Sequence, residues 1–226
     1  MSVLSRLFSP RRVAWIKTVY FNFHYFPFSV AIHLPVLVYR RTLLSRMDGR
    51  ISINVPLKRG IFKLGALELG TQDSYYSRTI WEVSGQLVIN GSVGMGRGSR
   101  ISIGKNATLT LGDRFVITGN STIICQKEIS FGSDCLLSWD VLVMDTDFHH
   151  INDEQGNIIN SPKAISIGNH VWIGCRTTIL KGVSIGNDNV VAANSLITRD
   201  VKDHHSVVGG QGKDVVIIKR GIDWRT

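Results

Sequence analysis

A short polar run at positions 145–150, Asp-Thr-Asp-Phe-His-His, carries the residue types of a proton-transfer site. Alternate residues of an extended segment lie on one face, so Asp145, Asp147 and His149 are expected to point the same way. A carboxylate beside an imidazole fixes its tautomer and stabilises the imidazolium that forms when the ring takes a proton. The run therefore predicts His149 as a general base with Asp147 and Asp145 as partners. His150 is the rival base, and both histidines could instead be surface residues of a loop.

A strict sixfold repeat of aliphatic residues predicts the scaffold that would hold this run. Six successive positions of the repeat are β-branched, namely Ile167, Ile173, Ile179, Ile185, Val191 and Ile197. An amphipathic helix would repeat at 3.6 residues and a half-buried strand at 2, so neither explains this period. Short strands joined by corners do explain it, because each coil must stack on its neighbours to bury its inward side chain. We therefore expect an all-β fold, a parallel β-helix.

The repeat continues upstream with interruptions. Leu111, Ile117 and Ile123 keep the spacing, as do Phe131, Leu137 and Val143, and the phase slips by two residues between these blocks. Such slips predict longer corners. Val143 and Ile167 are four hexads apart, but Asp145 to Pro162 is polar and rich in turn residues, and a long irregular segment inside a repeat is usually functional or disordered. We expect an N-terminal extension over 1–50, largely helical or irregular, a β-helix over 51–205 with a loop at 144–164, and a tail over 206–226.

Composition narrows the partners. Lysine and arginine outnumber aspartate and glutamate by 26 to 17, giving a net charge of +9, which suits an anionic partner. No helix-turn-helix, zinc-finger or RNP pattern is present, so we expect no nucleic acid partner. Three cysteines without CxxC spacing fit isolated thiols in a reducing compartment, and no secretory signal is recognisable. A cytoplasmic location is therefore expected.

The N-terminal extension mixes aromatic and basic residues. Aromatic residues from Trp15 to Phe28 lie among Arg11, Arg12 and Lys17, but prolines and polar residues interrupt the apolar stretch that a spanning helix would need. The extension could simply pack on the main domain. Alternatively, it could be an interfacial anchor that gives peripheral contact with the inner face of a membrane.

The run ISIGNHVWIGCRTTILKGVSIGNDNVVAANSLITRDV, at 165–201, resembles the hexapeptide-repeat acyltransferases, in particular the galactoside, maltose and Nod-factor acetyltransferases and the O-acetyltransferases of capsule or O-antigen sugars. The resemblance covers about residues 101–213. It implies a left-handed β-helix, a homotrimer with active sites between neighbouring subunits, acetyl-CoA as cosubstrate without a metal, and a saccharide acceptor that could be lipid-linked. The expected reaction is O-acetylation of a sugar hydroxyl in bacterial surface polysaccharide.

The resemblance also implies roles for single residues. His149 occupies the place of the family's catalytic histidine, where the loop leaves the coil, and Asn120 matches an asparagine that contacts the acceptor. Implied coenzyme contacts are Cys175, Ala193, Thr198, Arg199 and Lys213, the last three toward the nucleotide and phosphates. Each of these five residues could instead have only a packing role in the solenoid. Asn120 could be a corner residue whose backbone lies in the left-handed region.

Some features depart from the family. The segment KDHHSVVGGQGKD at 202–214 lacks the usual prolines, which puts coenzyme contacts there in doubt. His204 and His205 lack the third histidine and the spacing that a zinc site on this fold needs, so no metal is expected. No serine or cysteine nucleophile adjoins His149, which favours direct transfer. N-acyl transfer to an amino sugar or serine-type acceptor remains open, as does a non-catalytic scaffold, although a scaffold has no need of the acidic-histidine run.

Overall fold

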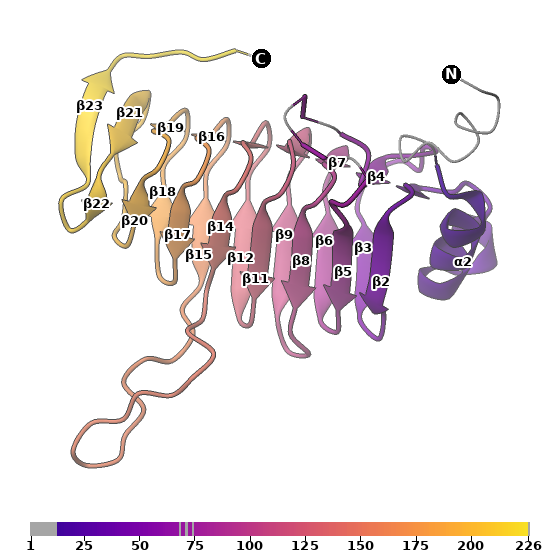
Figure 1. Ribbon diagram of the computed structural model, residues 1–226, viewed down its shortest axis with the longest axis horizontal. Coiled ribbons are helices and arrows are strands. Elements are labelled where there is room, and N and C mark those ends of the chain that lie inside the picture. The colour runs from indigo at the N-terminus through magenta and orange to yellow at the C-terminus, as the bar shows by residue number, and fades with distance from the viewer. Residues whose placement is uncertain (1–12, 68, 71, 74, 226) are drawn as a thin grey trace.

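The computed structural model describes residues 13–67, 69–70, 72–73 and 75–225. Within them, the strands stack into three sheets that wind as a solenoid from one end of the molecule to the other (Figure 1). Helices α2 (Trp15–Tyr25) and α3 (Phe28–Ala31) lie at the end where the chain enters. This arrangement confirms the predicted parallel β-helix with a partly helical N-terminal extension.

Each of the first six coils contributes one strand to each sheet, and the last coils contribute only to sheets I and II. Sheet I contains β1 (Val36–Val38), β4 (Phe62–Leu64), β7 (Val93–Met95), β10 (Phe115–Ile117), β13 (Leu136–Leu137), β16 (Trp172–Ile173), β19 (Val190–Val191), β21 (Ser206–Gly209) and β23 (Val216–Arg220). Sheet II contains β2 (Thr42–Arg46), β5 (Thr79–Val83), β8 (Arg100–Ile103), β11 (Thr122–Cys125), β14 (Leu142–Met144), β17 (Thr178–Leu180), β20 (Leu196–Ile197) and β22 (Gln211–Gly212). Sheet III contains β3 (Arg50–Ile53), β6 (Gln86–Ile89), β9 (Thr108–Leu111), β12 (Glu128–Phe131), β15 (Ile165–Ile167) and β18 (Ser184–Ile185).

The sixfold repeat becomes one inward side chain in each of six successive strands, from Ile167 at the end of β15 to Ile197 at the end of β20. All six side chains are buried, none more than 3% exposed. Because β15 pairs in register with β18, Ile167 lies directly below Ile185, and the aliphatic residues form columns along the axis. The core is therefore a stack of layers, each formed by one coil.

The phase slips fall at one corner of the solenoid. Residues 104–107 and 126–127 lie between a strand of sheet II and the next strand of sheet III. The strands on either side of them have four residues, against two or three in β15–β20, so the prediction of longer corners is wrong at 126–127, where the extra length lies in the strands. The long irregular segment, residues 145–164, leaves from the same corner between β14 and β15. The chain thus inserts residues where extra length does not disturb the stacked strands.

The solenoid extends beyond the predicted boundaries at both ends. The first coil is formed by β1, β2 and β3, so it begins at residue 36 rather than at 51. At the other end β21 and β22 continue sheets I and II past residue 205, and β23 turns back to pair with β21 in antiparallel fashion. These edge coils lack the clean hexad, which is why the sequence pattern placed them outside the repeat. In the described part of the chain, no helix is long and apolar enough to span a membrane.

Neighbouring coils approach most closely at the corners, and this predicts a strong effect of a single methyl group. A Cβ on Gly112 would lie 2.3 Å from both the carbonyl carbon and oxygen of Gly132 in the next coil. Gly112→Ala should therefore lower the free energy of unfolding by about 1–3 kcal/mol, measured by urea titration. Gly70→Ala is the matched control, since a Cβ there meets nothing within 4 Å. Equal stability of the two variants would contradict the close packing of coils at this corner.

Candidate active site

The loop of residues 145–164 projects from the side of the solenoid as a long twisted hairpin (Figure 1). An antiparallel bridge between Asn152 and Ile158 closes its outer part. At its base lies a hollow of about 200 Å³ lined by Gln126, Thr146, Asp147, Phe148, His149, His150, Asn160 and Pro162. Both histidines and one of the predicted aspartates thus surround a concave, partly polar space.

Asp145 does not face this hollow. Its side chain is completely buried and accepts hydrogen bonds from the backbone amides of Gln126, Lys127 and Glu128, at 2.7–2.8 Å. These amides belong to the preceding coil, at the corner below the loop. The prediction that Asp145 points the same way as His149 is therefore wrong: the carboxylate satisfies a tight corner of the backbone, where the loop leaves the solenoid.

Asp147 lies at the base of the hollow and is held by two partners. Its carboxylate pairs with the ammonium group of Lys181 and accepts a hydrogen bond of 2.9 Å from Asn160 Nδ2. These two hydrogen bonds lower the pKa of Asp147, with Lys181 the larger cause. The pairing is therefore present at neutral pH and is lost only as the pH falls below the ordinary carboxylate range, about 3.9. Asn160 also donates to the carbonyl of His149 at 2.8 Å, so it ties the two strands of the loop together.

His149 and His150 are both exposed, and within the described residues neither ring has a hydrogen-bond partner. Phe148 explains why the expected alternation fails. Its φ of 61° is left-handed, and the His149 amide donates back to the carbonyl of Asp147 at 2.7 Å. The chain therefore turns at Phe148 instead of continuing as an extended strand. The imidazole of His149 is left available at the rim of the hollow, without the carboxylate partner that the sequence predicted.

Asn120 lies at the opposite edge of sheet II, at the corner that precedes β11. Its φ of 53° is left-handed, as at other corner residues in the same place, Asp140, Arg176 and Asn194. Its side-chain oxygen accepts a hydrogen bond of 2.8 Å from Gln72. Within one chain, Asn120 and the loop are thus separated by the width of the sheet. Asn120 has the geometry of a corner asparagine, and a single chain does not bring it to His149.

The predicted coenzyme residues divide between the same two corners. Cys175 and Ala193 occupy equivalent positions in successive coils at the corner between sheets I and II, where the Asn194 amide donates to the Cys175 carbonyl at 2.8 Å. Ala193 is exposed, and Cys175 is half-buried. They lie on the edge that also carries Asn120.

Thr198, Arg199 and Lys213 lie at the other corner, between sheets II and III, on the edge that carries the loop. Because β20 pairs with β22 in parallel register, Thr198 and Lys213 follow paired residues and are neighbours in successive coils. All three are exposed, and the Arg199 guanidinium donates to the carbonyl of Val215. Across the last strands, the five residues thus form two groups on opposite edges of sheet II.

The remaining cysteines do not offer a nucleophile. Cys125 and Cys135 are buried in the solenoid, as expected for isolated thiols. Burial raises the pKa of Cys135 to about 11, and burial together with the neighbouring Asp145 raises that of Cys125 further. Thiols that are protonated and inaccessible at neutral pH are poor nucleophiles.

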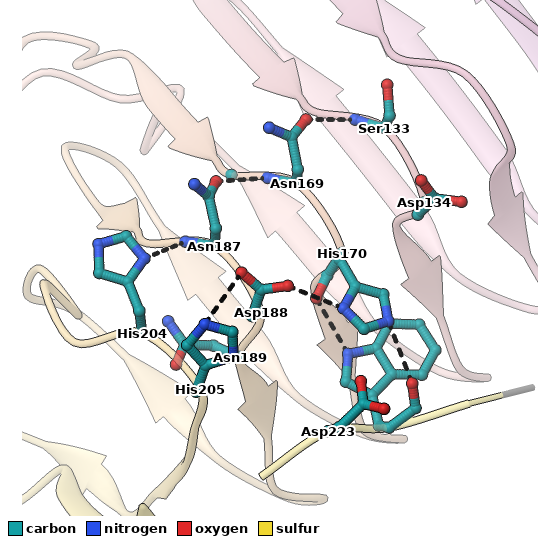
Figure 2. Close-up of polar contacts among 12 residues, drawn as sticks. Ser133, Asp134, Asn169, His170, Asn187, Asp188, Asn189, His204, His205 and Asp223 are labelled. Atoms are coloured by element: carbon teal, nitrogen blue, oxygen red, sulfur yellow. Dashed lines mark hydrogen bonds and ion pairs between the residues drawn. The ribbon is translucent and has the colours of Figure 1, made fainter. Parts of the chain in front are cut away.

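A second group of histidines and acidic residues lies at the third corner, between sheets III and I (Figure 2). Here the histidine rings make stacking and hydrogen-bond contacts that hold the fold together. His170 stacks on Trp224 with ring centroids 4.4 Å apart, and its two ring nitrogens lie 3.0 Å from the Asp188 carboxylate and 3.1 Å from the Trp224 carbonyl. His204 accepts a hydrogen bond from the Asn187 amide. These contacts pin the C-terminal tail to the solenoid.

The third corner lacks the features of a reactive site. A hollow of about 370 Å³ lies beside it, but its Arg114 is already paired with Asp113 and Asp134. Among the described residues, no group of three or more His, Cys, Asp or Glu side chains has an arrangement that could hold a metal ion. The loop at the corner between sheets II and III is therefore the better candidate for chemistry.

Comparison with known proteins gives the class. Residues 164–199 match the family described as bacterial transferase hexapeptide (six repeats). The galactoside O-acetyltransferase of Escherichia coli K12 is 34% identical over 106 residues, which are 46% of this chain and 47% of the relative. The polysialic acid O-acetyltransferase of Escherichia coli O1:K1 is 34% identical over 137 residues, 60% of this chain and 41% of the relative. The chain thus spans less than half the length of these curated relatives.

The structure of the polySia-specific acetyltransferase NeuO superposes with a TM-score of 0.56 at 24% identity, over 82% of this chain and 72% of that one. This likeness concerns the fold, and it confirms the predicted left-handed β-helix. Together with the matched repeat and the curated relatives, it agrees with the sequence resemblance: the chain is similar to the hexapeptide-repeat transferases.

The sequence patterns missed Lys181 and Asn160. Lys181 lies one coil beyond the loop and meets Asp147 only because the coils stack, and Asn160 returns to the base from the far strand of the loop. The repeat does carry a signal for Lys181: it follows β17, the strand that pairs with β14, at the corner from which the loop itself leaves.

The two aspartates of the run should differ sharply in their effect on stability. Asp145→Ala removes a buried carboxylate and leaves three backbone amides without their acceptor, so it should lower the free energy of unfolding by about 2–3 kcal/mol. Asp147→Ala removes only a partly exposed ion pair and should cost less than about 1 kcal/mol. Urea denaturation of the two variants measures the difference. A small effect of Asp145→Ala would overturn the structural role given to that carboxylate.

Proposed function

We propose that the protein is an acetyl-CoA-dependent O-acetyltransferase that modifies a sugar hydroxyl of a bacterial surface polysaccharide. The single observation that carries the proposal is His149, whose exposed imidazole lies at the rim of the hollow beneath an irregular loop and has no hydrogen-bond partner among the described residues. The matched repeat and the relatives, which are named as O-acetyltransferases of galactosides and polysialic acid, support the reaction class.

In this mechanism His149 acts as the general base. Its free ring nitrogen takes the proton of the acceptor hydroxyl, whose oxygen then attacks the acetyl carbonyl of the thioester. The imidazolium returns the proton to the departing thiolate, so acetyl passes directly to the sugar and free CoA is the other product. Without a nucleophilic side chain beside His149, a covalent enzyme intermediate is not required. Asp147 contributes by fixing the base of the loop through Lys181 and Asn160, rather than by contacting the imidazole.

The acetyl donor is proposed to lie along the edge of sheet II toward the C-terminal coils. Thr198, Arg199 and Lys213 would hold the nucleotide and phosphates, because they are exposed, two are cationic, and they share the edge that carries the loop. Cys175 and Ala193 would contact the pantetheine arm from the opposite edge. The exposed cations fit phosphate, and the small Ala193 side chain fits a closely approaching chain.

The edge of sheet II with Asn120 and the edge with the loop lie on opposite sides of the sheet in one chain. We therefore propose that a second copy completes the site, in the homotrimer that the family resemblance implies. Outward residues of sheets II and III support this. In four successive coils, sheet II carries at least one apolar, half-exposed outward residue, namely Ile124, Leu142, Met144, Leu180 and Leu196. Those of sheet III include Thr110, Ser130, Ser166 and Ser184. Covering sheet II with another subunit would bring the Asn120 edge of one copy to the loop edge of the next.

The proposed location is the cytoplasm, at the inner face of the membrane. Acetyl-CoA is a cytoplasmic metabolite, and saccharide acceptors of this kind can be carried on a lipid. The protein would therefore meet both substrates at that surface.

His149→Ala should reduce turnover by about 10²–10⁴-fold, because it removes the proton acceptor. Turnover is measured as free thiol released from acetyl-CoA in the presence of sugar acceptors. His150→Ala is the matched control, since it changes the neighbouring exposed histidine and should keep most of the activity. CoA binding, measured by calorimetry, should be unchanged in both.

Other results of this assay would change the proposal. Loss of activity in His150→Ala with full activity in His149→Ala would transfer the base to His150. Turnover with amino sugars alone would make the enzyme an N-acyltransferase. No turnover with any acceptor and no CoA binding would leave a non-catalytic solenoid.

Lys213→Ala should raise the KM for acetyl-CoA by about three- to tenfold, because the ammonium group is proposed to face the phosphates. The KM for acetyl-pantetheine, which lacks the nucleotide, should not change. Lys127→Ala serves as control, since Lys127 is an exposed lysine on the same edge but in a coil before the loop. An equal rise in KM for both donors would contradict a contact between Lys213 and the phosphates.

A further inference from the structure

The N-terminal helix α2 presents an apolar face that the solenoid does not cover. Its outward residues Ile16, Tyr20 and Phe23 share one side of the helix, and Ile16 is 88% exposed. Phe28 at the start of α3, which contacts Phe23, is 72% exposed. A helix on the surface of a protein in water normally turns polar residues outward, so a contiguous apolar face marks an interaction surface.

The helix is fixed in this orientation by its other side. Asn22 is fully buried, and its side chain bonds both the amide and the carbonyl of Val36 in β1, at 3.1 and 2.7 Å. Phe21 packs edge-on against Trp81, and the Trp81 indole donates to the Tyr25 hydroxyl at 2.9 Å. Rotation of α2 to hide its apolar face would break these buried contacts. The buried contacts of α2 therefore hold its apolar face toward the solvent.

Positive charge is concentrated at the same end. The described residues 13–67 contain eight lysines and arginines and a single acidic residue, Asp48, whereas residues 68–226 contain fifteen basic and sixteen acidic residues. The described part of the N-terminal extension and the first coils thus carries an excess of positive charge that the later coils lack. Cations and rings also meet directly, since the Arg59 guanidinium lies 4.9 Å from the centre of the Trp15 ring.

We propose that α2 and α3 dock the protein on the surface of an anionic lipid membrane. Aromatic and aliphatic side chains beside lysine and arginine are the combination that binds the boundary between headgroups and acyl chains, with the apolar face buried to about 5–10 Å. A second copy fits this face less well, because two ends of the same high positive charge repel each other. The eleven residues of α2 extend about 16 Å, too short to cross a bilayer, so the helix lies in the interface.

Docking by this end would set the distance of the loop from the membrane. The loop leaves after β14, and four strand spacings separate β14 from β2 in sheet II. At about 4.8 Å per spacing, the base of the loop stands about 19 Å along the axis from the first coil. The site would then reach sugars that extend away from the bilayer rather than the lipid itself.

Sedimentation with vesicles tests the proposal independently of acyl transfer. The wild-type protein should bind vesicles of phosphatidylcholine with phosphatidylglycerol, should ignore pure phosphatidylcholine, and should be released at about 0.5 M salt. The double variant Ile16→Ser with Phe23→Ser should bind about tenfold more weakly. Because both side chains are exposed, its thermal unfolding should match the wild type. The control Val216→Ser with Ile218→Ser removes exposed apolar residues at the opposite end and should bind as the wild type.

Two results would overturn the proposal. One is failure of the wild type to bind anionic vesicles, or equal binding by the Ile16→Ser and Phe23→Ser variant. The other is a rise in molecular mass with protein concentration that this variant abolishes, since a second copy would then be the occupant of the face.

Discussion

Each coil of this protein can bury its inward side chains only against the coils before and after it. That constraint explains the sixfold repeat, because every strand supplies an inward residue at the same position, as Ile173 and Val191 do in sheet I. It also explains where functional residues can lie. The strands are occupied by stacking, so variation is confined to corners and to the outward face of each sheet. The loop, the predicted coenzyme residues and Asn120 are all at corners.

The constraint also gives the carboxylate of Asp145 its role. A loop of twenty residues that leaves a stacked corner exposes the backbone amides of the coil below, and these need acceptors. Asp145 supplies its two oxygens to three of them at the first position of the loop. Asp145 thus fixes the start of the loop, and Lys181 bonds both Asp147 on the departing side and the carbonyl of Asn160 on the returning side. His149 stands between these two anchors, so its freedom from partners does not imply a loosely placed residue.

The sequence predicted the fold far better than the site, for a physical reason. The hexad is a local, periodic requirement of the core, so counting positions from Ile167 to Ile197 was enough. The geometry of the run at 145–150 depends instead on one dihedral, the left-handed φ of Phe148, and on contacts with residues from other coils. The alternation of side chains along an extended strand predicts neither this dihedral nor these contacts. It therefore wrongly placed Asp145 on the same face as His149. Lys181 was equally invisible, because it reaches Asp147 through stacking and not through sequence proximity. The N-terminal boundary was missed because the first coil carries no clean hexad.

Charge is distributed unevenly along the axis of the solenoid, and this fits membrane docking at the N-terminal end and acyl transfer in the later coils. The N-terminal end carries the excess of basic residues and an apolar helix face that is held outward by Asn22 and Phe21. The remaining coils are almost balanced in charge, and two of their cations on the loop edge, Arg199 and Lys213, lie where an anionic cosubstrate is proposed to bind. A solenoid is well suited to this separation, since it transmits a fixed distance between its ends through stacked strands. Reach toward a membrane and chemistry at the corner can therefore vary independently, one through the length of the solenoid and the other through the loop.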